Sequence, residues 1–580
     1  MARCYDNLSR EDLIELLKKQ DKELALKKYG LVWDSEKEPE KVVLDCENNL
    51  PILQRVFDKE IKTDDSDCNI LIEGDNFHAL SVLNYTHKGK IDVIYIDPPY
   101  NTGNKDFKYN DTYVDKEDGY RHSKWLNFME KRLNLAKELL SLDGIIVISI
   151  NDIEHSNLKI LLDKIFGEKN YIADLPTIMN LKGNQDNFGF ADTHEYTLLY
   201  AKNKEECKIN LFEIDEDELD DWEEDEFGLY KKADTLRRTG QDAPRERRPK
   251  GWFPVFIDEE KQQVYVTEND QPRKKSDILI FPINESGVEV SWSWGKTKIM
   301  QENHNLILTK SKTGKYNIYK KQRPQIGDLP TKKPKTLFYK PEYSSSTSTN
   351  ELKKMFGRKV FNNPKPVPLI KDLIYLTTKN NAIILDFMAG SGTTAHALLS
   401  LNNEDRGNRR FILCTNNENQ ICTEVCYPRI EKVINGYNKN GNGEFIKGLG
   451  GNLQYFKTDF IKNSENIEQL KINLTYKCTE MLCLKENIYN LKEEQEDYKI
   501  FVSNKKDKYL CVYYNFLNES FEQFLKTLKE IKEEKIIYIF SLENSFNKEF
   551  LEEVDNYKLE TIPQKILDVY KKIIKENIRG

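Results

Sequence analysis

Short apolar runs alternate with amphipathic segments in two separate parts of the sequence, at 69–166 and at 382–415. Short continuous apolar runs predict buried strands, and apolar positions spaced by three or four predict helices. The expected strands are 69–73, 91–96, 144–150, 382–387 and 410–415, and the expected helices are 75–83, 123–140, 153–166 and 393–401. Such alternation is typical of a doubly wound, mostly parallel α/β sheet, which holds ligands at the carboxyl ends of its strands. We expect both parts to contribute strands to one sheet.

Charge and composition divide the rest of the chain. A charged helix is predicted at 12–28, and a Ser/Thr-rich stretch at 343–350 is predicted to be a loop that crosses between units. Near the C-terminus, strands are expected at 498–502, 509–514 and 536–540, and a helix at 521–533. The expected organisation is an N-terminal helical and linker region at 1–64, a core in two parts at 65–202 and 351–451, an insert at 203–350, and a small C-terminal α/β domain at 452–580.

The insert is locally basic in a chain whose net charge is -8. Residues 229–250 carry eight Lys or Arg against three acids, and 296–340 carry twelve against two. Just before them, 213–226 holds 11 acids in 14 positions. That run predicts a solvated loop or exposed face, with DNA mimicry as the alternative. Any nucleic-acid binding must therefore come from the local basic surface and not from the chain as a whole.

Composition indicates a globular protein of a reducing cytoplasm. The 580 residues are 38% hydrophobic, which is enough for a large buried core. No apolar run approaches the roughly 20 residues that span a bilayer. The ten cysteines are dispersed and include no CxxC pair. Cys422 and Cys426 lack a second Cys/His pair at a zinc-like spacing, so we expect reduced structural thiols and no metal.

The segment Asp97-Pro98-Pro99-Tyr100 follows an expected strand and carries the sharpest chemical signal. Two consecutive prolines have fixed φ angles and no amide hydrogens, so they form a rigid corner whose preceding carbonyl groups can accept hydrogen bonds. A carboxylate and a free carbonyl beside the ring of Tyr100 suit an exocyclic amino group that lies over that ring. The alternative is an ordinary turn at the end of a strand.

A second signal is the run from Leu385 to Thr394 (LDFMAGSGTT), which combines a strand end, a tight glycine turn and a helix start. Glycines at such a turn let the backbone approach a ligand closely. A phosphate-binding P-loop is disfavoured because no Lys follows the last glycine, and the dinucleotide fingerprint lacks its third glycine. The turn is therefore expected to admit a compact, partly cationic ligand.

Together the two segments resemble the DPPY and FxGxG motifs of S-adenosylmethionine-dependent amino-methyltransferases that act on DNA. Their order, with DPPY first, then a long basic insert and FxGxG last, resembles the β class of these enzymes. Longer stretches look like the Mod subunit of type III restriction-modification systems: LIEGDNFHAL, IDVIYIDPPYNTGNKDFKYND, LDFMAGSGTTAHALLSLN, GNRRFIL, RRTGQDAPRERRP and IPQKILDVYKKI. The resemblance implies a Rossmann-like doubly wound methyltransferase core with an inserted DNA-recognition domain.

The resemblance also implies an activity and partners. The chain would transfer a methyl group from S-adenosyl-L-methionine to N6 of adenine in duplex DNA, after flipping the base out of the helix. The implied partners are double-stranded DNA, a second copy of the chain and a Res helicase-nuclease subunit. Two alternatives stay open: a stand-alone methyltransferase without an endonuclease partner, and a DNA-specificity module that has lost catalysis. Cytosine-N4 activity is less favoured because those enzymes more often carry SPP than DPP.

Residue roles follow from the same resemblance. Asp97 and the carbonyl of Pro98 would accept hydrogen bonds from the adenine amino group, Pro99 would complete the corner, and Tyr100 would stack on the extruded base. Cofactor contacts are implied for Asp75, Asp386, Phe387, Ala389, Gly390, Gly392, Thr393, Thr394 and Asn416. The stretch 360–366 resembles a segment that helps to close the cofactor pocket.

Two regions of the chain leave choices open. The family commonly ends the strand after the FxGxG helix with an acid that holds the ribose, but Thr415 stands there, which leaves Asn416 or Glu418 for this role. In the insert, DNA contacts are expected from Arg237, Arg238, Arg245, Arg247, Arg248, Lys296 and Lys298. Flat apolar surface for DNA is expected from Trp252, Phe253, Trp292 and Trp294. Phosphate contacts would dominate the affinity. If the insert does not read the sequence, the loop at 104–121 is the alternative.

Overall fold

The computed structural model describes residues 40–183, 189–214, 222–311, 314–324, 331–439, 443–464, 466–514, 520–542 and 545–577, together with Ile14 and Leu17. They divide into two compact units, one of 1–210 with 335–580 and one of 211–334. Apart from Ile14 and Leu17, the helix predicted at 12–28 lies outside the described residues. Within the described ranges, no helix combines the length and the apolar character that a membrane crossing needs.

A nine-stranded sheet forms the centre of the larger unit. Its strands, in spatial order, are β1 (Asn49–Arg55), β22 (Asn452–Lys462), β2 (Cys68–Glu73), β19 (Arg410–Thr415), β18 (Ile383–Asp386), β3 (Ile91–Ile96), β6 (Leu140–Ile150), β8 (His194–Ala201) and β7 (Tyr171–Ile178). The strands from β22 to β6 run parallel, whereas β1, β8 and β7 pair antiparallel with their neighbours. The expected mostly parallel, Rossmann-like sheet built from both parts of the sequence is confirmed.

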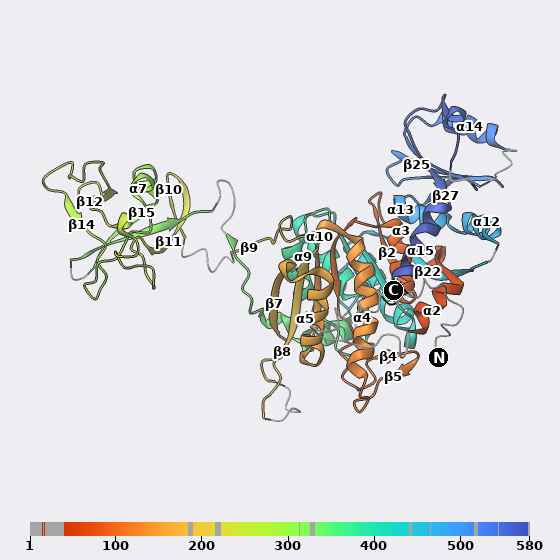
Figure 1. Ribbon diagram of the computed structural model, residues 1–580, viewed down its shortest axis with the longest axis horizontal. Coiled ribbons are helices and arrows are strands. Elements are labelled where there is room, and N and C mark those ends of the chain that lie inside the picture. The colour runs from red at the N-terminus through yellow and green to blue at the C-terminus, as the bar shows by residue number, and fades with distance from the viewer. Residues whose placement is uncertain are drawn as a thin grey trace. The chain divides into compact units, whose positions relative to one another are not determined.

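Buried apolar strands explain why this sheet forms. Residues Cys68–Glu73 are buried at every position, and in Ile91–Ile96 only Asp92 is partly exposed, as a parallel sheet covered on both faces requires. The helices between the strands are α3 (Asn76–Thr86), α4 (Arg121–Leu139), α5 (Asp152–Phe166), α9 (Val367–Thr377), α10 (Thr393–Asp405) and α11 (Tyr427–Asn435). In Figure 1, α4 and α5 run side by side, and α5 also contacts β8.

The prediction of a loop at 343–350 is wrong, because most of these residues form the start of helix α8 (Ser345–Phe356). The hydroxyl of Ser344 caps the helix by accepting a hydrogen bond from the amide of Ser346. Inside the helix, the hydroxyls of Ser348 and Thr349 donate to the carbonyl of Ser345 at 2.9 and 3.0 Å. Serine and threonine can thus satisfy their hydroxyls within a helix, which composition alone does not reveal.

The C-terminal region forms a second, five-stranded sheet. Its strands are β23 (Asn490–Glu494), β24 (Tyr498–Val502), β25 (Lys508–Tyr513), β26 (Glu534–Phe540) and β27 (Tyr557–Ile562), and its helices are α12 (Ile467–Lys477), α13 (Thr479–Glu486), α14 (Phe521–Glu530) and α15 (Gln564–Asn577). The expected small α/β architecture is confirmed. However, 452–462 form β22 of the central sheet, and the Tyr570 hydroxyl donates to the carbonyl of Pro51, so this region is joined to the core.

The smaller unit, 211–334, is built mainly from short antiparallel strands. One sheet contains β10 (Trp222–Asp225), β11 (Gly228–Thr235), β16 (Tyr316–Gln322) and β15 (Leu306–Lys310), and a second contains β13 (Gln263–Tyr265), β12 (Val255–Asp258) and β14 (Ile278–Ile280). Strands β9 (Phe212–Glu213) and β17 (Thr331–Lys332) pair with each other, so the chain enters and leaves this unit at one place. Of the acidic run at 213–226, residues 215–221 lie outside the described residues.

A buried ion pair joins the segment before α2 (Lys41–Asn48) to α4. The guanidinium of Arg132, which is fully buried, donates to both carboxylate oxygens of Glu40 at 2.7 and 2.9 Å and lies 3.7 Å from the ring centroid of Phe128. A charged side chain stays ionised inside a protein only when it is paired with an opposite charge and hydrogen-bonded.

Glu40→Ala should therefore lower the free energy of unfolding by up to about 3–5 kcal/mol, because it removes the hydrogen-bonded partner of the buried Arg132 and leaves only Asp75, 3.8 Å away, to face its charge. The double variant Glu40→Gln with Arg132→Met removes the charge as well and should recover much of that loss. Calorimetric melting of the three proteins measures this. A double variant that melts no higher than Glu40→Ala would contradict the assigned role of the pair.

Candidate active site

The two motifs leave neighbouring strands at the same edge of the central sheet. Strands β3 and β18 run parallel, with Leu385 opposite Ile94. Asp97 follows β3 and Asp386 ends β18, so both lie where the parallel strands end, which we call the carboxyl edge. Strand β8 runs antiparallel to β6 and therefore begins at this edge, with Glu195 as its second residue. Segments from distant parts of the sequence thus meet at one edge of the sheet.

A fully buried tryptophan holds the turn formed by Asp97-Pro98-Pro99-Tyr100, which we call the proline corner. The indole Nε1 of Trp125, on α4, donates a hydrogen bond of 2.7 Å to the carbonyl of Pro99. No described residue donates to the carbonyl of Pro98, which therefore keeps its capacity to accept a hydrogen bond from a ligand. The side chain of Asp97 is 30% exposed. The corner thus offers two acceptor groups, a carboxylate and a carbonyl, held on a rigid turn.

Tyr100 lies in a hydrogen-bonded group with Asp97, Glu195 and Lys365, which we call the Tyr100 cluster. The Tyr100 hydroxyl is 2.9 Å from Asp97 Oδ1 and 3.0 Å from Glu195 Oε2, and Lys365 Nζ also donates to it. The Lys365 ammonium is 2.5 Å from Glu195 Oε2 and 3.4 Å from Asp97 Oδ1. Sequence reasoning missed both Glu195 and the position of Lys365 in this cluster.

Burial and charge act against each other in the Tyr100 cluster. Burial raises the pKa of Asp97, Lys365 works against this shift, and the Glu195 carboxylate adds to it. Burial also raises the pKa of the Tyr100 phenol well above its ordinary value. For Lys365, burial lowers the pKa, but the carboxylates of Asp97 and Glu195 outweigh burial, so the net shift is upward. At neutral pH, therefore, the Tyr100 phenol is neutral and Lys365 is charged.

The glycine turn after β18 has the expected left-handed backbone. Gly390 has a φ of 49° and Gly392 a φ of 75°, a region that residues with a Cβ rarely adopt. A Cβ on Gly390 would lie 3.5 Å from the ring of Phe361, and one on Gly392 would lie 3.1 Å from Cys426 Sγ. The amide of Ala389 donates to the carbonyl of Cys414, which ties the turn to β19. The turn therefore depends on both glycines.

Several expected cofactor residues hold the turn itself. Asp386 is buried and accepts hydrogen bonds from the amide of Met388 at 3.0 Å and from the hydroxyl of Thr394 at 2.5 Å. The buried guanidinium of Arg429 donates to the hydroxyl of Thr393 at 2.8 Å. Phe387 and Ala389 are also buried, at 1% and 7% exposure. Arg429 was missed by sequence reasoning, because nothing local connects it to the turn.

Asp75 and Asn416 lie beside neighbouring strand ends. Asp75 follows β2 and caps α3 by accepting from the amide of Phe77 at 2.7 Å. Asn416 follows β19, is exposed, and accepts from the amide of Glu418 at 3.3 Å. The Glu418 carboxylate itself pairs with Lys108 at 3.0 Å. In the described part of the chain, no group of three or more His, Cys, Asp or Glu side chains could hold a metal ion.

The basic residues expected to contact DNA are mostly paired within the smaller unit. Arg237 donates to Asn317 Oδ1 at 2.9 Å, whereas Arg248 is exposed and its side chain has no partner among the residues that the structure describes. The ion pairs are Arg245 with Glu289 at 2.7 Å, Arg247 with Asp242 at 3.3 Å, Lys296 with Asp270 at 2.5 Å and Lys298 with Glu302 at 3.8 Å. The side chain of Arg238 is partly buried, and its Nε has no described partner.

The prediction that four aromatic residues (Trp252, Phe253, Trp292 and Trp294) form a flat apolar surface is wrong for two of them. Phe253 and Trp292 are 5% and 3% exposed and belong to the apolar core of the smaller unit. The indole of Trp292 donates to the carbonyl of Phe253 at 2.9 Å. A unit of short strands needs large side chains to fill its interior, so these two rings stabilise the unit and are not available as surface. Trp252 and Trp294 remain partly exposed.

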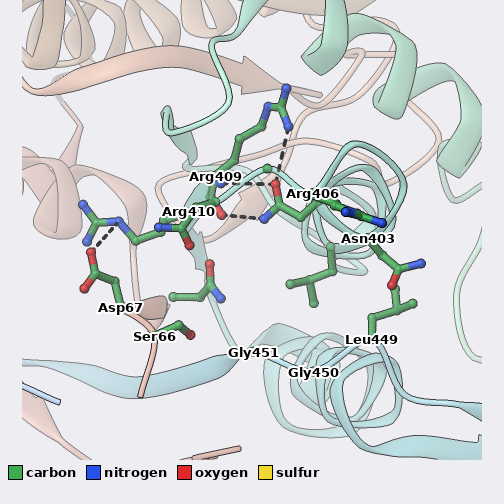
Figure 2. Close-up of a pocket in the computed structure, with 14 residues that line it drawn as sticks. Ser66, Asp67, Asn403, Arg406, Arg409, Arg410, Leu449, Gly450 and Gly451 are labelled. Carbon is green, nitrogen blue, oxygen red and sulfur yellow. Dashed lines mark hydrogen bonds and ion pairs between the residues drawn. The ribbon is translucent and has the colours of Figure 1, made fainter. Parts of the chain in front are cut away.

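A cavity of about 420 Å³ lies at the opposite edge of the sheet, where β2, β19 and β22 begin. Figure 2 shows Arg410 pointing toward Asp67 there, and their charged groups are 3.9 Å apart. The amide of Arg409 donates to Asn402 Oδ1 at 3.1 Å. None of the expected catalytic or cofactor residues lines this cavity. We place the candidate active site at the carboxyl edge, because both motif loops meet there.

Comparison with known proteins agrees with a candidate active site at the carboxyl edge of the sheet. Residues 91–425 match the DNA methylase family, a span that includes the proline corner, the glycine turn and the Tyr100 cluster. The chain belongs to the DNA methylase family. The Mod subunit of the type III restriction-modification enzyme EcoPI, from Escherichia phage P1, is 47% identical to this DNA methylase over an alignment of 443 residues that covers 72% of this chain and 68% of that subunit. The resemblance to type III Mod subunits is confirmed.

Two further relatives differ in type. The EcoP15I Mod subunit of Escherichia coli is 28% identical over 456 residues, covering 71% of this DNA methylase and 68% of that subunit. The type II methyltransferase M.KpnI of Klebsiella pneumoniae is 34% identical over 374 residues, covering 64% of this chain and 85% of that enzyme.

Solved structures align weakly. The M1.HpyAVI–SAM complex aligns at a TM-score of 0.27 and 14% identity, over 63% of this chain and 98% of that one. The cytosine-N4-specific PvuII DNA methyltransferase aligns at a TM-score of 0.30 and 11% identity, over 63% and 92%. At these TM-scores neither structure bears on the assignment.

Replacing Asp386 by Asn in this DNA methylase should flatten the pH dependence of its stability. Burial raises the pKa of Asp386 to about 7 from an ordinary value of 3.8, so the folded protein holds the proton more tightly than the unfolded chain. Its contribution to stability is fully present below the unfolded pKa and is lost as the pH rises to about 7. Each tenfold difference in proton affinity between the two states is worth about 1.4 kcal/mol.

The measurement is the thermal midpoint from about pH 4 to about pH 7. The midpoint of the unaltered protein should fall more steeply across this window than that of Asp386→Asn. Thr394→Ser keeps the hydroxyl that bonds Asp386 and should keep the steep slope. Equal slopes in the unaltered protein and Asp386→Asn would contradict the prediction.

Proposed function

We propose that this protein is a site-specific DNA methyltransferase that transfers a methyl group from S-adenosyl-L-methionine to N6 of adenine, as the Mod subunit of a type III restriction-modification system. The observation that carries the proposal is the pair of acceptors, the Asp97 carboxylate and the unused carbonyl of Pro98, beside the ring of Tyr100. They lie one strand away from the glycine turn. The sequence match over 91–425 and the 47% identity to the EcoPI Mod subunit support it.

The proline corner suits a poor nucleophile. The amino nitrogen of adenine has its lone pair delocalised into the ring. Two hydrogen bonds, to Asp97 and to the Pro98 carbonyl, draw its hydrogens toward the acceptors and favour tetrahedral geometry at nitrogen. Because the acceptors are fixed by the rigid corner and by Trp125, they need no reorganisation when positive charge develops on that nitrogen. No nucleophilic cysteine is required.

The target base must leave the duplex to reach this corner. Flipping costs roughly a few kcal/mol, and stacking on an aromatic ring returns about 1–3 kcal/mol. Tyr100 supplies that ring, and contacts of its hydroxyl with Asp97, Glu195 and Lys365 hold the end of the side chain in place. The Tyr100 cluster therefore prepares both the stacking surface and the acceptor.

The residues at the neighbouring strand ends suit S-adenosylmethionine. The left-handed glycines leave room beside Phe361 that a Cβ on Gly390 would enter, at 3.5 Å from the ring. Gly390 and Gly392 would hold the methionine part, and Asp75 and Asn416 the adenosine part. The cofactor supplies an electrophilic methyl group when it is bound.

Partners and location follow from the proposed class. We assign DNA reading to the unit 211–334, which contains Arg237, Arg238 and Arg248. The relatives named as subunits of restriction-modification enzymes support a nuclease partner, and pairing with a second copy and a cytoplasmic location remain predictions. A stand-alone modification enzyme stays the second candidate, because the type II methyltransferase M.KpnI is 34% identical.

Labelled S-adenosylmethionine and unmethylated bacterial DNA test the reaction. After digestion to nucleosides, the unaltered protein should place label in N6-methyladenine. Asp97→Ala should slow transfer about 10²- to 10³-fold, the usual cost of removing one preorganised hydrogen-bonding group, and leave cofactor affinity nearly unchanged. Gly390→Val should lose cofactor binding instead, because it places a branched side chain in a left-handed turn. Label in N4-methylcytosine, or full turnover by Asp97→Ala, would contradict the proposal.

Exchanging the smaller unit tests where the DNA sequence is read. Residues 211–334 can be replaced by the corresponding unit of a relative, because β9 and β17 pair at its base and keep the two junctions together. We expect the methylated site to change to that of the donor and cofactor binding to stay the same. Sequencing methylated genomic DNA reads the outcome. A chimera that still marks the original site would move recognition to another segment, such as the loop at 104–121.

A further inference from the structure

We propose that Lys365 and Glu195 are positioning residues that set, in opposite directions, the charge of the Asp97 carboxylate. This inference rests on the proposed function, in which ionised Asp97 accepts the adenine amino group. Neither residue belongs to the DPPY or the FxGxG segment. Lys365 precedes α9 and Glu195 opens β8, and the sheet brings both to the proline corner.

Counting protons around the Tyr100 hydroxyl explains why the cluster needs a cation. The hydroxyl lies within hydrogen-bond distance of two carboxylates, at 2.9 Å from Asp97 and 3.0 Å from Glu195, yet it has one proton to donate. Two ionised carboxylates around one hydroxyl would leave one contact without a proton. They would then either share a further proton or need a neighbouring positive charge.

Lys365 supplies that positive charge. Its ammonium has three hydrogens, and it lies within reach of the Tyr100 hydroxyl, Glu195 Oε2 at 2.5 Å and Asp97 Oδ1 at 3.4 Å. The residue is 8% exposed, and a buried ammonium persists only when it is paired. With Lys365 in place, both carboxylates can stay ionised, and the cluster keeps one net negative charge toward the methylated nitrogen, which becomes positive.

Other charged or titratable groups near Asp97 belong to the neighbouring strands and remain the same in the variants. Asp386 ends β18, and its pKa is raised by burial and, to a smaller extent, by Asp97. The Tyr95 hydroxyl, on β3, is 3.1 Å from Ser149 Oγ, and burial keeps its pKa well above the ordinary value. Only Lys365 and Glu195, among the described residues, contact the Tyr100 hydroxyl together with Asp97. Changes at these two positions therefore act on Asp97 most directly.

Single-turnover methyl transfer at saturating cofactor and DNA, measured from about pH 5 to about pH 9, tests the inference. The rate should rise with pH as Asp97 ionises. Lys365→Met removes the cation and should move the midpoint of this rise to higher pH, by about 1–3 on the pH scale, the effect expected of an opposite charge at this distance. Glu195→Gln removes a like charge and should move the rise to lower pH. Lys365→Arg keeps the charge and should leave the rise near its original position.

The opposite signs separate this role from general damage. A structural role would lower the plateau rate of both variants without moving their pH profiles apart, and Glu195→Gln keeps the test alive if Lys365→Met does not fold. Cofactor binding, measured by calorimetry, should be unchanged in Glu195→Gln. Lys365 lies in the stretch 360–366 that is expected to help close the cofactor pocket, so saturating cofactor is what separates a loss of binding in its variants from a shift of the pH profile. pH profiles that do not move, or that move in the same direction in both variants, would overturn this inference and leave the proposed function intact. An unaltered protein that methylates no adenine would overturn the proposed function, and this inference with it.

Discussion

Parallel pairing between β3 and β18 brings the proline corner and the glycine turn to one edge of the sheet, and the remaining features of the site depend on this pairing. The two strands come from separate parts of the sequence, with the smaller unit between them. Their pairing is stabilised by buried apolar side chains on both strands, so the position of the site is fixed by the core and not by the loops. The antiparallel strand β8 then adds Glu195 at the same edge.

Two buried cations support this edge in different ways. Lys365 faces carboxylates and keeps its charge because they surround it. Arg429 is 1% exposed and donates to neutral oxygens of Ser391 and Thr393, which lie in and after the glycine turn. In the proposed function, one cation therefore adjusts the charge of the reacting carboxylate, and the other holds the glycine turn that is expected to contact the cofactor.

The sequence predicts the strands and helices that carry the motifs, because buried parallel strands have continuous apolar runs and their end residues are locally distinctive. It does not predict Glu195, Lys365 or Arg429. Each of these acts through a residue far away in the chain, and a charged residue at a strand start or before a helix looks like solvated surface. The helix at Ser345–Phe356 and the buried ring of Trp292 were missed for a related reason, since composition does not reveal which partners a side chain finds.

The position of β22 bears on how the protein is made. This strand, Asn452–Lys462, lies between β1 and β2, two strands that come much earlier in the chain. Until translation has passed residue 462, β1 has no neighbour in the sheet. Strand β2 has two open sides until its other neighbour, β19 (Arg410–Thr415), is made, and one open side from then until β22 follows. Unpaired strand edges are templates for aggregation, and long-range pairing is slow. The edges of β1 and β2 that later pair with β22 must therefore be protected through most of the synthesis. A chain that ends before β22 would have an open sheet and would not be a shorter working enzyme.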